Sequence, residues 1–238
     1  MTPVQRATGW QRHLWYRKEI LKTTWKLRLL VLLGLLLLGM TTRASWTQWL
    51  AKSLVCREEQ TPSDAILVEN FDTDYLVFER AAALMKAGLA PRVLLPLWSS
   101  DEPPYPNLVS QGISDVMIRV ARMPTPTIIP IQAIEPISLN AVLQIRTFLE
   151  HEQIRSLLVV APGFRSQRSA LVYRAVLNPA GIAVSCVPVF GQKTPEHWTV
   201  TWHGIQDVTE QWLKLQYYRV YVLRTARVPG TPALAAGH

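Results

Sequence analysis

Arg165 and Arg168 are the residues whose chemical type and spacing point most directly to ligand binding. They stand three positions apart at the start of an amphipathic stretch, and residues three apart on a helix share one side. A guanidinium group can hold a phosphate or a carboxylate through two parallel hydrogen bonds. The spacing therefore predicts that both arginines contact one anion. The alternative is a solvated pair held by a glutamate or by the backbone.

Two further segments carry polar residues that could contact a ligand. The first, residues 69–74, is rich in acids and could position a cation or a hydroxyl-bearing ligand, or Asp72 or Asp74 could cap a helix. In the second, Ser138 follows Pro136 and precedes an amphipathic stretch, which predicts a helix N-cap and a position suited to an anion. The predicted ligand-binding residues are Glu69, Asn70, Asp72, Glu135, Ser138, Asn140, Arg165 and Arg168.

The short motifs that mark several common enzyme classes are missing from the sequence. There is no glycine-rich phosphate loop, no G-x-S-x-G motif and no Walker lysine, which argues against a classical NAD site and against P-loop hydrolysis. The five histidines are scattered without metal-ligand spacing, so no metal site is predicted, and the sequence identifies no cofactor. No histidine falls in the polar segments, so a general acid or base would have to be Glu69 or Glu135.

The elements that must position these residues alternate along the chain. Short runs rich in Val, Ile and Leu predict strands covered on both faces, and the longer amphipathic stretches between them predict helices. This alternation favours a Rossmann-like three-layer α/β sandwich with a mostly parallel sheet, in which ligands bind beyond the carboxyl ends of the strands. The predicted strands are residues 65–68, 93–95, 128–131, 157–160 and 182–187, and the predicted helices are 75–86, 108–121, 139–151 and 166–177.

The α/β domain is predicted to span residues 63–224 and to end in an aromatic-rich helix from about His203 to Leu223. Trp212, Leu215 and Tyr218 or Arg219 share one side of that helix by the 3.6-residue period. Packing on the sheet or contact with a membrane surface would explain the aromatic residues, and core packing is favoured. Residues 225–238 are small and contain Pro and Gly, which predicts a disordered tail.

The positive charge of the chain is concentrated at its N-terminus. Residues 1–28 hold seven basic groups and one acidic group, a net charge of +6, whereas the other 210 residues hold 18 basic and 16 acidic groups, a net charge of +2. The pI of 9.8 is therefore a property of the N-terminal arm. Nucleic-acid binding is not predicted, because no clustered Lys/Arg face occurs beyond that arm.

An apolar segment follows the basic arm and predicts a transmembrane helix over residues 29–46. Leu29 to Met40 carries no charge, and Trp25 and Trp46 bracket a stretch of the length a bilayer needs. The positive-inside rule then places the N-terminus in the cytoplasm and the α/β domain on the far side of the inner membrane, after a stalk over residues 47–62. A cleaved signal peptide and a buried core helix are the alternatives. The arm itself could lie on anionic membrane lipid.

The two cysteines, Cys56 and Cys186, do not make a disulfide framework by their spacing. Cys186 is predicted to be a small buried hydrophobic residue on a strand. A disulfide bond between the two is compatible with an oxidising compartment, and the sequence does not decide whether it forms.

From Asp64 to about Tyr218 the chain resembles the YdcF/SanA/ElyC-like proteins, an envelope-linked family of unknown function. The strand at residues 64–68, the helix holding residues 79–81 and the turn at 88–92 look like the family's opening elements. Glu135, Ser138 and Asn140 resemble its E-x-x-S-x-N motif, and Arg168 stands at the arginine of its H-x-x-R helix start. The chain departs from the family where a glycine-rich turn is replaced by residues 69–71, where residues 141–144 differ, and where Arg165 stands at the histidine position.

Three functions follow as hypotheses. The first is a membrane-anchored envelope protein that binds a small anionic, nucleotide-like or lipid-linked ligand at the edge of the sheet, in cell-envelope or polysaccharide biogenesis. The second is a non-catalytic assembly factor with a partner in a membrane complex, suggested by the altered motif and the aromatic helix. The third is a hydrolase or transferase that acts on an envelope precursor. The sequence does not decide whether the chain is an enzyme.

Overall fold

A computed structural model describes residues 25–71, 74–99 and 107–225 of the chain. Several predicted features lie outside the described residues: the arm up to residue 24, Asp72 and the C-terminal tail from residue 226. The chain divides into two compact units, residues 1–45 and 46–238.

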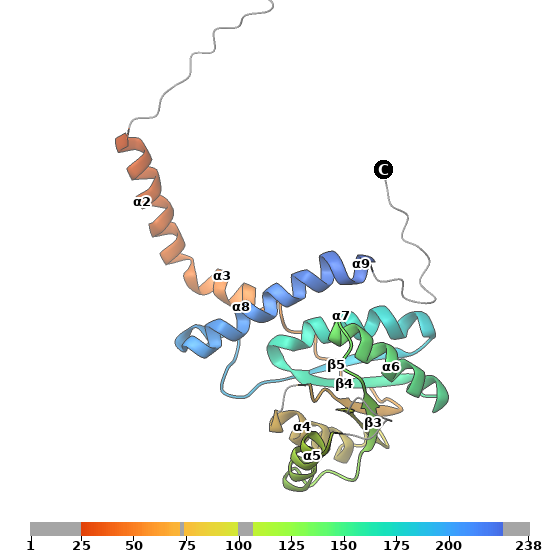
Figure 1. The fold of residues 1–238 in the computed structure, drawn as a ribbon. Helices are drawn as coiled ribbons and strands as arrows, with labels where there is room; N and C mark the ends of the chain where they lie inside the picture. Colours follow the sequence, from red (N-terminus) through yellow and green to blue (C-terminus); the bar gives the residue numbers. More distant parts are fainter. Residues whose placement is uncertain (1–24, 72–73, 100–106, 226–238) are drawn as a thin grey trace, which may run out of the picture. The chain divides into compact units, whose positions relative to one another are not determined.

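The larger unit is built on a five-stranded, all-parallel sheet with the strand order β3-β2-β1-β4-β5 (Figure 1). All residues of β1 are buried, as expected of a central strand with helices on both faces. The predicted α/β fold with a Rossmann-like parallel sheet is confirmed. The strands are β1 (Ala65–Val68), β2 (Val93–Trp98), β3 (Thr127–Ile131), β4 (Ser156–Pro162) and β5 (Ala183–Val189).

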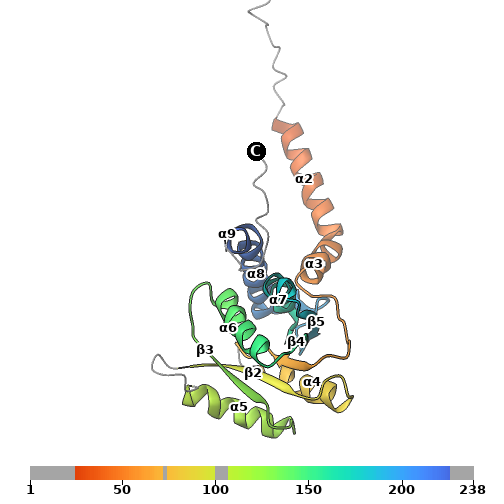
Figure 2. The same ribbon diagram turned by 90° about the vertical axis from the view of Figure 1, so that its right-hand side faces the viewer.

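Helices cover both faces of this sheet (Figure 2). On one face lie α4 (Tyr75–Lys86) and α5 (Leu108–Val120), and the core beneath them includes Phe78. On the other face lie α6 (Ile137–His151) and α7 (Ser166–Leu177), with Ile145 in the core. The sheet therefore separates two hydrophobic layers, as the sequence predicts.

The C-terminal helix packs on the outside of α7 (Figure 1). It consists of α8 (Trp202–Tyr217), a π-helical segment η4 (Tyr218–Val222) and α9 (Leu223–Thr225). Leu215 and Tyr218 are buried, so core packing of these two residues is confirmed, but Trp212 remains 37% exposed. Val208 and Leu215 mark the buried side of α8. By the 3.6-residue helical period, Trp212 lies outside that side.

The smaller unit contains α2 (Trp25–Thr41), in which no residue is buried. Within the described ranges no single helix is long and apolar enough to cross a membrane. Only α2 together with α3 (Arg43–Lys52) meets that criterion, as a pair bent by 59°. The predicted span of residues 29–46 thus crosses a break between two helices, at Thr42.

Part of the segment predicted as a stalk, residues 47–62, packs against the domain. Ala51 of α3 and Leu54 after it are buried in a cluster with Val208 and Leu215 of α8. The backbone carbonyl of Thr47 accepts a hydrogen bond of 3.2 Å from the indole N–H of Trp198, in the 3-10 turn η3 (Trp198–Val200). These partners are more than 100 residues away in the sequence, so the local pattern could not reveal them.

A disulfide bond between Cys56 and Cys186 fastens the same segment to β5. The backbone N–H of Glu59 donates to the carbonyl of Cys186, and the hydroxyls of Thr61 and Ser185 lie 2.5 Å apart. Cys186 is fully buried, as predicted, but it is bonded to Cys56. The segment therefore covers part of the outer edge of β5, which would otherwise present unpaired backbone groups.

Candidate functional site

The strand order reverses direction between β1 and β4, and such a switch point is the usual ligand position in an open α/β sheet. Glu69 follows β1 directly, and the 3-10 turn η1 (Gly163–Arg165) follows β4 and leads into α7. Parallel pairing of the two strands brings these ends to the same edge. The segments that hold Glu69 and Arg165 therefore meet at the edge of the sheet where the sequence predicts a ligand site.

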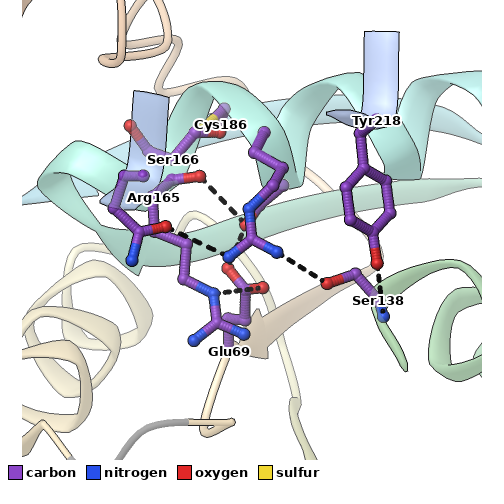
Figure 3. Close-up of polar contacts among 9 residues, drawn as sticks. Glu69, Ser138, Arg165, Ser166, Cys186 and Tyr218 are labelled. Carbon is purple, nitrogen blue, oxygen red and sulfur yellow. Dashed lines mark hydrogen bonds and ion pairs between the residues drawn. The ribbon is translucent and has the colours of Figure 1, made fainter. Parts of the chain in front are cut away.

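Glu69 is a buried carboxylate, 2% exposed, held by two partners on the α7 side of the switch point. Its Oε1 lies 3.4 Å from Nε of Arg165, and its Oε2 accepts a hydrogen bond of 2.5 Å from the Ser169 hydroxyl. The Arg165 guanidinium also stacks 5.3 Å from the centre of the Phe71 ring. Figure 3 shows Glu69 and Arg165 facing each other. Arg165 thus neutralises an internal charge.

Arg168 belongs to a second network that joins three helices. Its Nη1 donates to the Ser138 hydroxyl of α6 at 3.0 Å, and its Nη2 donates to Oε1 of Gln211 of α8 at 3.2 Å. The guanidinium lies 5.5 Å from the centre of the Tyr218 ring, and the Tyr218 hydroxyl accepts from the backbone N–H of Ser138 (Figure 3). Arg165 contacts Glu69, whereas Arg168 contacts Ser138 and Gln211. That the two arginines share one anion stays a prediction.

Tyr173 of α7 lies beside the Glu69 network and is fully buried. Burial, and secondly the negative charge of Glu69, raise the pKa of the Tyr173 phenol well above its usual value. Among the described residues its hydroxyl has no hydrogen-bond partner. The nearby charge of Arg165 acts in the opposite direction but does not offset these two effects, so the phenol stays neutral at physiological pH.

The remaining predicted site residues serve local structure. Asn70 donates from its side-chain amide to the Ser114 hydroxyl of α5 at 3.0 Å. Glu135 is exposed and accepts from the backbone N–H of Ile137 at 3.3 Å. Asn140 donates to the backbone carbonyls of its own loop, at Ile134 and Pro136.

The predicted N-cap is wrong at one helix and confirmed at another. Pro136 occupies the N-cap position of α6, and Ser138 lies inside the first turn, where it is buried and used by Arg168. Asp74 caps α4, because its carboxylate accepts from the backbone N–H of Leu76 at 3.0 Å. The cap alternative for the acidic loop is therefore confirmed for Asp74.

A cavity of about 770 Å³ opens at this edge of the sheet, beside the Glu69 network. The starts of three helices line it: Leu76 in the first turn of α4, Gly163 in η1 before α7, and His203 in the first turn of α8. The backbone N–H groups at a helix start carry a partial positive charge, so this arrangement favours an anion. Of the predicted site residues that the structure describes, Arg165 alone lines the cavity.

The loop between β5 and α8, together with the first turn of α8, supplies cavity residues that the sequence prediction missed. Lys193, His197 and His203 all line the cavity. Nζ of Lys193 lies 3.8 Å from a carboxylate oxygen of Asp207, and Nδ1 of His197 lies 3.1 Å from the Thr194 hydroxyl. The exclusion of histidine from this edge is therefore wrong, because the loop after the fifth strand also emerges there. The carboxyl-end rule, applied to all five strands, would have found it.

The described ranges contain no group of three or more His, Cys, Asp or Glu side chains placed to hold a metal ion. The cavity is lined by basic side chains and helix starts, and also by the carboxylates of Asp74 and Asp207.

No family model, curated protein or solved structure matches the chain. The resemblance to the YdcF/SanA/ElyC-like proteins remains a prediction, and functional inference rests on the geometry of the cavity.

Proposed function

We propose that the chain is a membrane-anchored envelope protein whose extracytoplasmic α/β domain binds a small anionic, phosphate- or carboxylate-bearing ligand in the 770 Å³ cavity. The observation that carries this proposal is the convergence of three helix starts with Lys193, His197 and His203 around one opening. Backbone N–H groups and cationic side chains together form the environment that phosphate groups prefer.

The position of the cavity supports the same proposal. It lies beyond the carboxyl ends of β4 and β5, next to the reversal of strand order, where nucleotides and related ligands bind in open α/β sheets. The buried Glu69–Arg165 pair lies behind it and fixes η1, so the backbone facing the cavity is held in place.

The side of the membrane is supported by two independent features. The apolar run of residues 29–40 follows an arm of net charge +6, which favours a cytoplasmic N-terminus. The Cys56–Cys186 disulfide fits an oxidising compartment, since disulfides seldom persist in a reducing cytosol. Both features favour a domain outside the cytoplasm.

Titration calorimetry of the purified full chain with inorganic pyrophosphate tests the ligand class. Lys193→Gln should weaken binding about ten- to a hundredfold, because one charge-assisted hydrogen bond is worth roughly 1.5–3 kcal/mol. The matched control is Lys86→Gln, which lies in a separate surface hollow between α4 and α5. Equal affinity of the Lys193 variant and the wild type, or no binding of pyrophosphate, inorganic phosphate or a dicarboxylate, would rule out the cavity as an anion site.

The two histidines favour a second candidate, a hydrolase or transferase that acts on an envelope precursor in the same cavity. His197 and His203 supply the acid–base groups that the sequence prediction sought in Glu69 and Glu135. Glu69 is instead engaged by Arg165 and Ser169. If the purified chain turns over a phosphoester, His203→Gln should abolish turnover and keep pyrophosphate binding within a few-fold; retained turnover would exclude this candidate.

A further inference from the structure

The C-terminal helix exposes apolar side chains on the side that faces away from the core. Trp202, Leu213 and Val220 are 72%, 57% and 61% exposed. They are separated by 11 and 7 residues, which places them on one line along a helix. The opposite side, with Val208 and Leu215, is buried. A helix that is apolar on both sides is costly to leave in water, so the outer side requires an apolar or interfacial environment.

Helix α3 continues this exposed surface. Trp46 and Trp49 are 51% and 70% exposed, while Ala51 packs in the cluster that also holds Leu215 of α8. Figures 1 and 2 both place α3 beside the first part of α8. We define the α3–α8 surface by its exposed apolar residues: Trp46, Trp49, Trp202, Ile205, Leu213, Tyr217 and Val220.

The charges around the α3–α8 surface are suited to anionic lipid. The two acids of α8 are both engaged by lysines: Glu210 by Lys214 at 2.5 Å, and Asp207 by Lys193 at 3.8 Å. Arg219 adds positive charge at the C-terminal end of the helix. Tryptophan and tyrosine with basic residues nearby are the side chains that favour the bilayer interface.

The length of chain between the apolar run and Trp46 decides what covers this surface. Only residues 41–45 separate Met40 from Trp46. Even fully extended, a connection of this length spans at most about 20 Å. A domain tethered so closely to the apolar run of residues 29–40 must keep Trp46 and α3 near the headgroups of the same bilayer.

We propose that the α3–α8 surface docks on the phospholipid headgroup region of the membrane that holds α2. The proposal rests on the membrane anchor of the proposed function and goes beyond it, because an anchor alone would leave the domain free to tumble. Docking fixes one side of the domain against the bilayer. The lipid surface would cover the outer side of α8, whose apolar side chains are exposed among the described residues.

Site-directed spin labelling of the full chain tests this docking. Single labels are placed at Leu213→Cys and Val220→Cys on α8, at Val116→Cys on α5 and at Leu35→Cys in α2. Each variant is reconstituted in vesicles of phosphatidylcholine and phosphatidylglycerol, with the nickel relaxant present on both sides. Val116 is the matched control, because it is 56% exposed and lies on the helix layer across the sheet.

Docking predicts a several-fold higher ratio of oxygen to nickel accessibility at positions 213 and 220 than at position 116. Trp202→Glu in the labelled Val220→Cys chain should return that ratio to the value at 116. The Trp202 side chain is mostly exposed, so this change should leave the fold intact, as circular dichroism would check.

The remaining outcomes overturn the proposal in distinguishable ways. If the label at 35 is in hydrocarbon while those at 213 and 220 behave as at 116, docking fails and the anchor stands. If the label at 35 is itself in water, the anchor fails and docking fails with it. Dipolar broadening between labels at 213 on two chains would assign the surface to a second copy and not to lipid.

Discussion

At the residue scale, Glu69 is the side chain that contributes most to stability at the switch point between β1 and β4. Glu69→Gln leaves the Arg165 guanidinium in a buried place without its carboxylate partner, which should lower the free energy of unfolding by roughly 3 kcal/mol. The matched control is Glu58→Gln. Glu58 pairs with Arg80 at 2.9 Å in an exposed position, where the loss should be about 0–1 kcal/mol. Denaturant unfolding of both variants measures the contrast, and equal losses would contradict the assigned role of Glu69.

Asp64 gives the domain an acid-sensitive contact at the start of β1. Its carboxylate accepts from the backbone N–H groups of Arg155 and Ser156, each at 2.8 Å. The hydrogen bond from Arg155, followed by those from Ser156, lowers the pKa of Asp64 below 3.8. Because the folded pKa is depressed, the stabilisation is present above pH 3.8 and is lost as the pH falls through the folded pKa.

Asp64→Asn should therefore flatten the loss of stability below pH 4, while the stability near neutral pH falls slightly. Unfolding midpoints measured between pH 2 and 7 test this. Glu79→Gln, on the exposed side of α4, controls for the removal of one negative charge. If the unfolding midpoint of Asp64→Asn fell below pH 4 as steeply as that of the wild type, the backbone contacts of Asp64 would not govern acid stability.

The sequence identified the site residues by type but not by orientation. Glu69 and Arg165 do meet at the predicted edge, because strand order alone brings their loops together. Whether an arginine faces a cavity or an internal partner depends on groups distant in sequence, such as Gln211 for Arg168. Arg168→Ala would therefore act mainly through stability, and it is a poor test of ligand binding.

At the element scale, two glycines in helices should respond in opposite directions to alanine. A Cβ atom at Gly204, in the first turn of α8, would lie 2.1 Å from the backbone carbonyl oxygen of Trp198, so the helix start or η3 would have to move. At Gly112 in α5, no atom lies within 4 Å of the added Cβ. We expect Gly204→Ala to lower stability by about 2 kcal/mol or more, and Gly112→Ala to raise it by roughly 0.5–1 kcal/mol. Thermal unfolding of the two variants measures these changes. A shift of the unfolding temperature in the same direction for both would contradict the packing described for α8.

The elements themselves were predictable because their patterns are local. β1, α4 and α7 begin and end at the predicted residues, where an apolar run or a helical period stands between clear turn signals. β4 and β5 extend further than predicted, to Pro162 and Val189. Their last residues are held by pairing with a neighbouring strand, which a local pattern does not record. The contacts of the predicted stalk with Trp198 and Cys186 could not be predicted for the same reason, because these partners are distant in sequence.

At the scale of the whole molecule, formation of the disulfide should depend on the charge of the basic arm. In the proposed topology, the arm sets which side of the membrane receives the domain, and the compartment sets whether Cys56 and Cys186 can bond. A disulfide between residues 130 apart removes much conformational freedom from the unfolded chain, so it should contribute roughly 3–5 kcal/mol to the domain. Reversed topology would therefore produce a domain that is both reduced and less stable.

Replacing Arg17, Lys18, Lys22, Lys26 and Arg28 by Gln tests this coupling in cells. The arm then loses five of its seven positive charges, and the domain should be retained in part on the cytoplasmic side. Alkylation trapping should show two free thiols in that fraction, whereas the wild-type chain should show none. Cys56→Ala/Cys186→Ala in the native arm is the control, since it should be exported normally but melt at a lower temperature that no longer responds to reductant. If the five-fold variant remained fully oxidised, the charge of the arm would not set the topology, and the apolar segment alone would have to direct the domain across the membrane.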